Sequence, residues 1–135
     1  MDNKDKEILY WLQQNGRMSM SELAEKVNLS DTPCLRRVKK LEQSGVISGY
    51  SALLDRKTLG LNVIIYAFVK LKTNSDENAE IFEHQTQKLD NVLECSVISG
   101  AHDYLLKIAA KDLEDYEAFV KKSLGSISAI SAIES

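Results

Sequence analysis

The amino-acid sequence predicts an α+β protein of two successive domains, a helical one followed by one with a β-sheet. Between residues 21 and 40, apolar residues recur at helical spacing in two short stretches that a polar turn separates. After the polar stretch at residues 55–60, the pattern changes to strand, helix, strand, strand and helix. We therefore expect a first domain at residues 1–54, a linker at 55–60 and a second domain at 61–135.

The first of the two short helices has a clear start signal. Ser19 and Glu22, three residues apart, are spaced as a capping box. Leu23, Ala24 and Val27 then fall on one apolar face, and the small Ala24 lets a second helix cross closely. The predicted core is completed by apolar residues of a preceding helix, namely Ile8, Leu9 and Leu12.

A second helix is predicted to start after Ser30, which is a favourable N-cap residue. Asp31 suits the positive end of the helix dipole, and Pro33 is tolerated because N–H groups of the first turn have no intrahelical partner. Successive positions are separated by about 100°, so the helix has an apolar side and a basic side. The apolar side consists of Cys34, Val38 and Leu41.

The basic side of this helix is typical of an element that enters a DNA major groove. Thr32 and Arg36 lie early enough to reach base edges, where an arginine can hold a guanine by two hydrogen bonds. Arg37, Lys39 and Lys40 are better placed for phosphates. The predicted DNA-binding residues are Ser30, Thr32, Pro33, Arg36, Arg37, Lys39 and Lys40.

The alternative interpretation of the basic run is a solvated helix face without a partner. The segment after the helix favours DNA binding instead. Gly45 is a good helix stop, and Val46, Ile47 and residues 50–54 have the composition of two short strands around Gly49. Two helices, a tight turn and such a β-ribbon together predict a winged helix-turn-helix with its motif at about residues 21–40.

The net charge of −3 is distributed unevenly along the chain. Residues 1–59 carry ten Lys or Arg against eight Asp or Glu, a net charge of +2, and residues 60–135 carry seven against twelve, a net charge of −5. The positive charge available to DNA is therefore local, on one helix. Dimerisation would double the phosphate contacts, and the acidic second half is not expected to bind nucleic acid.

The second domain is expected to have the ferredoxin-like order β-α-β-β-α. Its predicted elements are a strand at 63–72, a helix at 78–89, strands at 92–99 and 104–110, and a helix over 113–124. Ile64, Tyr66 and Phe68 are large and lie on one face of the first strand. We expect another sheet to cover that face.

The chain offers no constellation typical of catalysis or of metal binding. Cys34 and Cys95 lie far apart without metal-ligand spacing, so both are predicted to be small buried hydrophobes in a reducing compartment. No signal peptide and no apolar run of about 18 residues is present. We therefore expect a cytoplasmic, nucleoid-associated protein with no membrane contact, no metal and no cofactor.

The sequence resembles the Lrp/AsnC (leucine-responsive, or feast/famine) family of transcriptional regulators over nearly its whole length. Matching residues of the opening helix are Asp2, Asp5, Ile8, Leu9, Leu12, Gln13, Asn15, Gly16 and Arg17. Residues 21–40, including Pro33, Cys34 and Leu35, match the family's helix-turn-helix. Further matches are Gly45 to Ile47, Gly49, Tyr50, Leu59, Gly60, Ser99, Gly100 and Asp103 to Lys107.

The resemblance implies a DNA-binding regulator of amino-acid or related metabolism whose second domain binds a small effector, expected to be an amino acid. It also implies domains that dimerise face to face and dimers that assemble further. The effector would bind near the loop joining the second and third strands, at Ser99, Gly100, Ala101, His102, Asp103 and Tyr104. Asp103 could accept a hydrogen bond from an α-amino group, although Gly and Asp are also ordinary turn residues.

The members of this family have a fourth strand, which lies beside the first. Residues 132–135 resemble only the beginning of that strand, so we expect it to be truncated, with an exposed edge.

Two other functions stay open. One is a DNA-bridging architectural protein without an effector. The other is an enzyme, because some haem-pathway decarboxylases resemble this architecture, and His84 and His102 are the candidate acid–base groups. We expect no enzyme, since no catalytic constellation accompanies either histidine.

Overall fold

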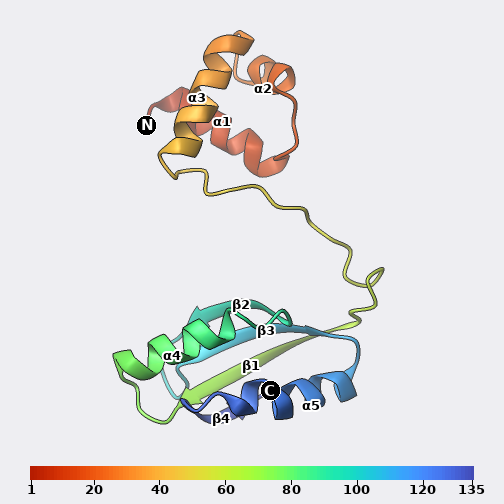
Figure 1. The fold of residues 1–135 in the computed structure, drawn as a ribbon. Coiled ribbons are helices and arrows are strands. Elements are labelled where there is room, and N and C mark those ends of the chain that lie inside the picture. The colour runs from red at the N-terminus through yellow and green to blue at the C-terminus, as the bar shows by residue number, and fades with distance from the viewer. The chain divides into compact units, whose positions relative to one another are not determined.

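The computed structural model describes residues 1–135 as two compact units, Met1–Leu54 and Asp55–Ser135. Unit 1 contains three helices, α1 (Asn3–Gln14), α2 (Met20–Lys26) and α3 (Asp31–Gln43). Unit 2 contains a four-stranded sheet and two helices (Figure 1). Its elements are β1 (Val63–Leu71), α4 (Asp76–Thr86), β2 (Val92–Val97), β3 (Tyr104–Ala110), α5 (Leu113–Lys122), the 3-10 turn η1 (Leu124–Ser126) and β4 (Ile130–Glu134). The predicted α+β class is confirmed.

Side-chain caps begin the helices of unit 1. In α1 the Asp2 carboxylate accepts the Asp5 N–H at 2.9 Å, and the Asp5 carboxylate accepts the Asp2 N–H at 3.4 Å. Ser19 caps α2 by accepting the Glu22 N–H at 3.1 Å, but Glu22 does not return the bond, so the predicted capping box is half formed. Ser30 is the N-cap of α3 by position, although its side chain makes no capping hydrogen bond.

The core of unit 1 confirms the predicted apolar faces. The turn between α2 and α3 passes through Asn28, which has φ 57°, and the Leu29 N–H donates to the Ala24 carbonyl at 2.9 Å. This tight turn brings the apolar faces of the two helices together against α1. The buried residues are Ile8, Leu23, Ala24, Val27, Cys34, Val38 and Leu41, and Leu9 and Leu12 pack at their edge.

The predicted wing strands are wrong, because residues 46–54 form no strand in the structure. Gly45, at φ +83°, ends α3, and the Ile47 N–H donates back to the Leu41 carbonyl at 3.0 Å. Val46 and Tyr50 are about half exposed, and Leu53 is 98% exposed. Two short segments with no third strand or covering helix have little to hold them in a ladder, because an isolated hairpin is marginally stable.

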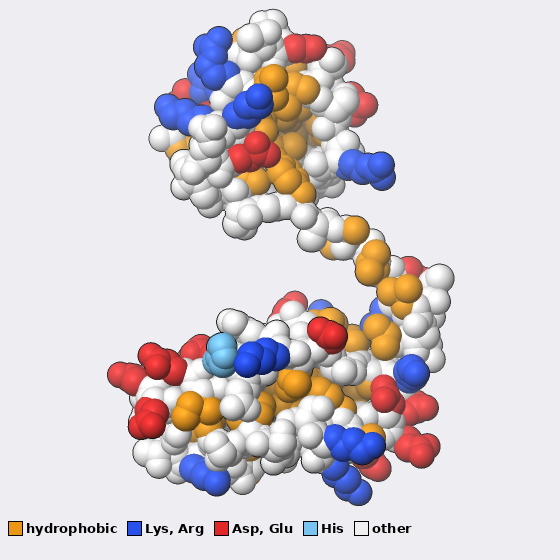
Figure 2. Space-filling view, in the orientation of Figure 1, with side chains coloured by type: hydrophobic (Ala, Val, Ile, Leu, Met, Phe, Trp, Pro, Cys, Tyr) orange, Lys and Arg blue, Asp and Glu red, His pale blue; other side chains and the backbone are white.

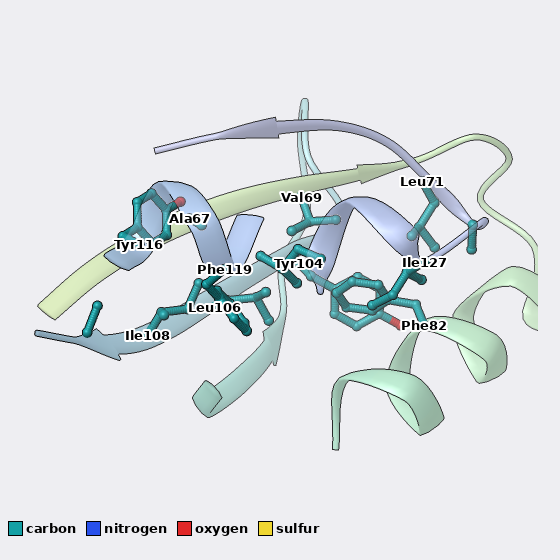
Figure 3. Packing of buried hydrophobic residues seen from close by; sticks show 13 residues of the cluster. Ala67, Val69, Leu71, Phe82, Tyr104, Leu106, Ile108, Tyr116, Phe119 and Ile127 are labelled. Carbon is teal, nitrogen blue, oxygen red and sulfur yellow. The ribbon is translucent and has the colours of Figure 1, made fainter. Parts of the chain in front are cut away.

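The sheet of unit 2 has the order β2-β3-β1-β4 and is antiparallel throughout. In its centre Ala67 pairs with Leu106 and Val69 with Tyr104. Phe82 of α4, with Tyr116 and Phe119 of α5, packs on these strand residues to form the core (Figure 3). The fourth strand lies beside β1, as the ferredoxin-like order predicts, and it starts at Ile130, two residues earlier than expected.

The opposite face of the sheet carries the large side chains that the sequence places together. Tyr66 and Phe68 of β1 are 53% and 39% exposed, and their cross-strand partners are Lys107 and Leu105. Because cross-strand partners share a face, these four side chains form one continuous surface opposite the helices. We call it the open sheet face.

One cysteine prediction fails. Cys34 is buried, as expected, but Cys95 is exposed, because β2 is an edge strand with a neighbour on one side only. Partial burial by neighbouring residues, together with the negative charge of Glu83 in α4, raises the pKa of the Cys95 thiol to about 11. The thiol therefore stays protonated at neutral pH despite its exposure.

Candidate nucleic-acid interface and effector loop

The outward side of α3 carries three cations without a partner. Arg36, Lys39 and Lys40 are exposed and take part in none of the ion pairs of the structure. Figure 2 shows Lys and Arg side chains gathered on the side of unit 1 where α3 lies. Three free cations on one exposed helix surface can contact an anionic backbone without first giving up an internal ion pair.

Ser30 and Thr32, at the start of α3, are exposed, and Pro33 is half-buried beside them. The carboxylate of Asp31 accepts a hydrogen bond from the Ser21 hydroxyl of α2 at 2.9 Å. That bond connects the first turn of α3 to α2. The start of α3 is therefore held in place by its neighbour while its polar side chains face outward.

Arg37 differs from the other cations of α3, because it is already paired. Its Nη1 lies 2.8 and 2.7 Å from the two carboxylate oxygens of Asp2 and 3.1 Å from Oδ1 of Asp5. These hydrogen bonds raise the pKa of Arg37, and the bond from Arg37 lowers the pKa of Asp2. The structure thus separates Arg37 from Arg36, Lys39 and Lys40, with which the sequence groups it.

The predicted effector loop connects β2 to β3. Ser99, Gly100 and Ala101 are exposed, and Gly100 has φ +108°, a conformation that L side chains rarely adopt. The Ile98 N–H donates to the Asp103 carbonyl at 3.0 Å and closes the loop. The three exposed residues form its tip.

Asp103 and Tyr104 are directed into unit 2 rather than toward the tip. The carboxylate of Asp103 accepts the Leu71 N–H at 2.7 Å, and the Asp103 N–H donates to the Val69 carbonyl at 2.8 Å. Tyr104 is 4% exposed, and its ring lies 4.5 Å from the ring of Phe82. Asp103 therefore ties the loop to β1, and Tyr104 belongs to the core.

His102 lies over the open sheet face. Its ring centre is 5.2 Å from that of Phe68, and its Nε2 is 3.0 Å from the Glu134 carboxylate at the end of β4. His84, the other histidine, is exposed on α4. The two histidines therefore occupy separate positions and do not form a shared acid–base site.

The sequence did not indicate the pairing of Arg37 with Asp2 and Asp5 or the bond from Leu71 to Asp103. Each joins groups about 30 residues apart, and charge patterns do not say which partners meet. The signal that could have indicated the first pairing is the presence of two carboxylates, Asp2 and Asp5, at the start of α1. Two acidic residues so close together favour an ion pair with an arginine of the same domain.

None of the helices combines the length and the apolar character that a membrane crossing would require. It also has no group of three or more His, Cys, Asp or Glu side chains arranged to hold a metal ion.

These features define a transcriptional regulator in which a helix-turn-helix unit precedes an α+β ligand-binding unit. Residues 1–48 match the family model for winged helix-turn-helix DNA-binding domains, and residues 65–135 match that for the Lrp/AsnC ligand binding domain. The chain belongs to the Lrp/AsnC family of transcriptional regulators.

Similar proteins support the assignment over both units. The chain is 43% identical over 124 residues to a leucine-responsive regulatory protein of Rhizobium meliloti (strain 1021), covering 92% of this chain and 80% of that protein. It is 37% identical over 134 residues to the transcriptional regulator AzlB of Bacillus subtilis (strain 168), covering 99% and 85%. A transcriptional regulator of Neisseria meningitidis, crystallised with L-Met, is 34% identical with a TM-score of 0.91, covering 99% of this chain and 86% of that one.

Proposed function

We propose that the chain regulates transcription of genes of amino-acid or related metabolism by binding double-stranded DNA through α3, under the control of an amino acid. In this proposal residues 1–54 bind DNA, residues 55–60 link the domains, and residues 61–135 bind the effector and dimerise. The observation that carries it is the exposed, unpaired set Arg36, Lys39 and Lys40, opposite the buried side of α3. A regulator of this kind acts in the cytoplasm, in association with the nucleoid.

Within α3 we propose a division of roles. Thr32 and Arg36 contact base edges from the first half of the helix, while Lys39 and Lys40 contact phosphates. Arg36→Ala should weaken binding to a selected site by about 1–3 kcal/mol and relax preference at one base pair. Lys40→Ala should weaken all duplexes alike and lower the salt slope of binding by roughly one.

The test is a salt titration of fluorescence anisotropy with two duplexes, one selected from a random library and one of scrambled sequence. Lys121→Ala, in α5 of the other unit, is the matched control for loss of one positive charge. If both α3 variants lose the same affinity on both duplexes, the division of roles is refuted. If the wild-type chain binds neither duplex, the DNA-binding proposal itself fails.

For the effector we propose an amino acid bound at the tip of the β2–β3 loop. Ser99, Gly100 and Ala101 are exposed and available for contact, whereas His102, Asp103 and Tyr104 support the loop from behind. The Neisseria meningitidis relative crystallised with L-Met supports this chemical class. A thermal-shift screen against the twenty amino acids, followed by DNA titrations with and without each hit, tests the proposal.

The same titrations separate regulation from DNA bridging without an effector. A change in DNA affinity with a bound amino acid supports a sensor, whereas DNA binding that no amino acid alters supports an architectural protein. We also propose that the chain acts by binding and not by catalysis. His102 is paired with Glu134, and His84 lies apart on α4.

We propose that two chains dimerise through the open sheet face. Tyr66 and Phe68 are exposed there beside Leu105. Covering such side chains with a second apolar surface removes them from water and stabilises the pair of chains. A twofold dimer would present two copies of α3, so DNA sites should be near-palindromic, with half-sites about one helical turn apart or a multiple of it. Sedimentation at micromolar concentration, with Phe68→Asp as the variant and Leu113→Asp on α5 as the control, tests the dimer.

A further inference from the structure

Arg37, Asp2 and Asp5 form a cluster of charges that joins the middle of α3 to the start of α1. We call it the α1–α3 clamp. Arg37 contacts both oxygens of Asp2 and one of Asp5, at distances of 2.7 to 3.1 Å. Arg37 and Asp2 are separated by 35 positions in the sequence, so these bonds are tertiary contacts between two helices.

The two carboxylates are held in place by contacts that do not involve Arg37. Asp2 and Asp5 bond to each other's backbone N–H groups as the capping box of α1. Asp5 is also mostly buried, with 18% of its side chain exposed. Although the Asp2 side chain is 57% exposed, a guanidinium bonded to three oxygens of this pair is restrained, and with it the position of α3 on α1.

The clamp makes Arg37 a poor phosphate ligand. Its guanidinium already faces two carboxylates, and a phosphate that approached it would be repelled by both. Only 33% of the Arg37 side chain is exposed, whereas Arg36, Lys39 and Lys40 are exposed and unpaired. The same helix therefore presents three cations outward and directs a fourth toward its own domain.

We propose that Arg37 is a positioning residue for DNA recognition, which sets the angle of α3 through Asp2 and Asp5 and makes no contact with phosphate. The proposal rests on the proposed DNA-binding function of α3. It differs from the sequence-based expectation that Arg37 contacts phosphate together with Lys39 and Lys40. The shifts of Arg37 to a higher pKa and of Asp2 to a lower one agree with it, because both groups stay charged across the neutral range.

The two roles of Arg37 predict opposite effects for a change at its partner. Asp2→Asn removes the negative charge but keeps a good helix N-cap, so α1 retains its start. If Arg37 positions α3, Asp2→Asn weakens binding to the selected duplex. If Arg37 binds phosphate and Asp2 only competes with the DNA, Asp2→Asn frees the guanidinium and tightens binding.

The experiment is a salt titration of duplex binding by the full chain and its variants Asp2→Asn, Arg37→Gln, Arg37→Lys and the double variant Asp2→Asn with Arg37→Gln. We expect each single variant to lose about threefold to tenfold affinity for the selected duplex, with the double variant no worse, as for residues of one network. The salt slope stays at the wild-type value. Lys39→Gln, the exposed unpaired control, lowers that slope by about 0.9.

Arg37→Lys keeps the positive charge but loses the fork that bonds two carboxylates at once. It should therefore behave like Arg37→Gln, whereas a phosphate ligand would be largely preserved by lysine. Far-UV circular dichroism and thermal unfolding establish that the compared variants are folded, and Arg37→Lys decides the question if Arg37→Gln unfolds.

The inference is overturned if Asp2→Asn tightens binding, or if Arg37→Gln lowers the salt slope by about one while Arg37→Lys does not. A wild-type chain that binds no duplex refutes the DNA-binding function, and the inference with it. If the wild-type chain binds but the variants behave as expected for a phosphate-binding Arg37, the inference is refuted and the DNA-binding function stands.

Discussion

The bond from the Leu71 N–H to the Asp103 carboxylate makes a sharp prediction about unit 2. Leu71 is 3% exposed and lies where the pairing of β1 with β4 shifts register, between Lys70 and Leu71. Its N–H points to the Asp103 side chain at 2.7 Å instead of continuing a regular ladder. Asp103→Ala would leave this buried N–H without an acceptor, so it should destabilise the sheet.

The size of the effect depends on the type of bond. A hydrogen bond to a charged group contributes about 1.5–3 kcal/mol net, and Asp103 is only half-buried, so the lower end applies. We expect Asp103→Ala to cost about 1.5–2 kcal/mol, which lowers Tm by roughly 6–16 °C in a domain of this size. Asp103→Asn keeps an acceptor oxygen and should cost only about 0.5–1 kcal/mol.

The assay is urea unfolding combined with hydrogen exchange of the Leu71 amide followed by NMR. Exchange at Leu71 should accelerate in Asp103→Ala more than in Asp103→Asn, while amides in the middle of β3 change only with global stability. Glu117→Ala, on the exposed side of α5, is the control for loss of one carboxylate.

Unchanged exchange at Leu71 together with unchanged stability would refute this reasoning. The same variants also test the effector role expected of Asp103. If Asp103→Asn keeps the wild-type effector response, the charge of Asp103 takes no part in effector binding. Loss of that response at nearly full stability would mean that the carboxylate serves the ligand as well as Leu71, since effector coupling of about 1–3 kcal/mol can depend on one strong contact.

Three further predictions concern both units. Cys34→Asp places an unpaired carboxylate at a fully buried position, so circular dichroism at neutral pH should show loss of helix in unit 1, whereas Cys34→Ala should remain folded. Cys95 should react slowly with iodoacetamide at pH 7–8 although it is exposed, and its rate should rise steeply only as the pH approaches its thiol pKa of about 11; a half-maximal rate near pH 8.5 would contradict this. Gly125→Ala would put a Cβ 2.9 Å from the Val120 carbonyl oxygen and should lower the free energy of unfolding in urea by about 1–3 kcal/mol. Gly49→Ala, whose added Cβ has nothing within 4 Å, should be close to neutral. Equal effects of the two variants would refute the steric argument.

The parts of the fold that depend on local periodicity were predictable. Cys34, Val38 and Leu41 recur at helical spacing, and all three are buried. The strand at Tyr104–Ala110 has the bounds that its composition predicts. In both cases the pattern lies within a single element, so no distant partner is needed to recognise it.

The parts that depend on distant partners were not predictable. The segment around Gly49 has the composition of a hairpin but lacks a neighbour that would stabilise it, so its expected strands are absent. Cys95 lies in an apolar pattern, yet the strand order places it at an edge. Of the cations of α3, Arg37 alone meets acids of α1, and nothing in the spacing of the four cations distinguishes it from the others.

The strand order of unit 2 also determines how the domain can assemble from the unfolded chain. β2 and β3 are joined by a short loop, so their pairing closes at a small entropic cost and can form early. β4 pairs only with β1, and Phe68 and Glu134, which face each other there, are about 66 residues apart in the sequence. Because such a distant contact requires closure of a long loop, β4 should dock after the other three strands are in register. It should also be the first strand to detach under native conditions, which would open one side of β1 while the β2–β3 pair stays intact.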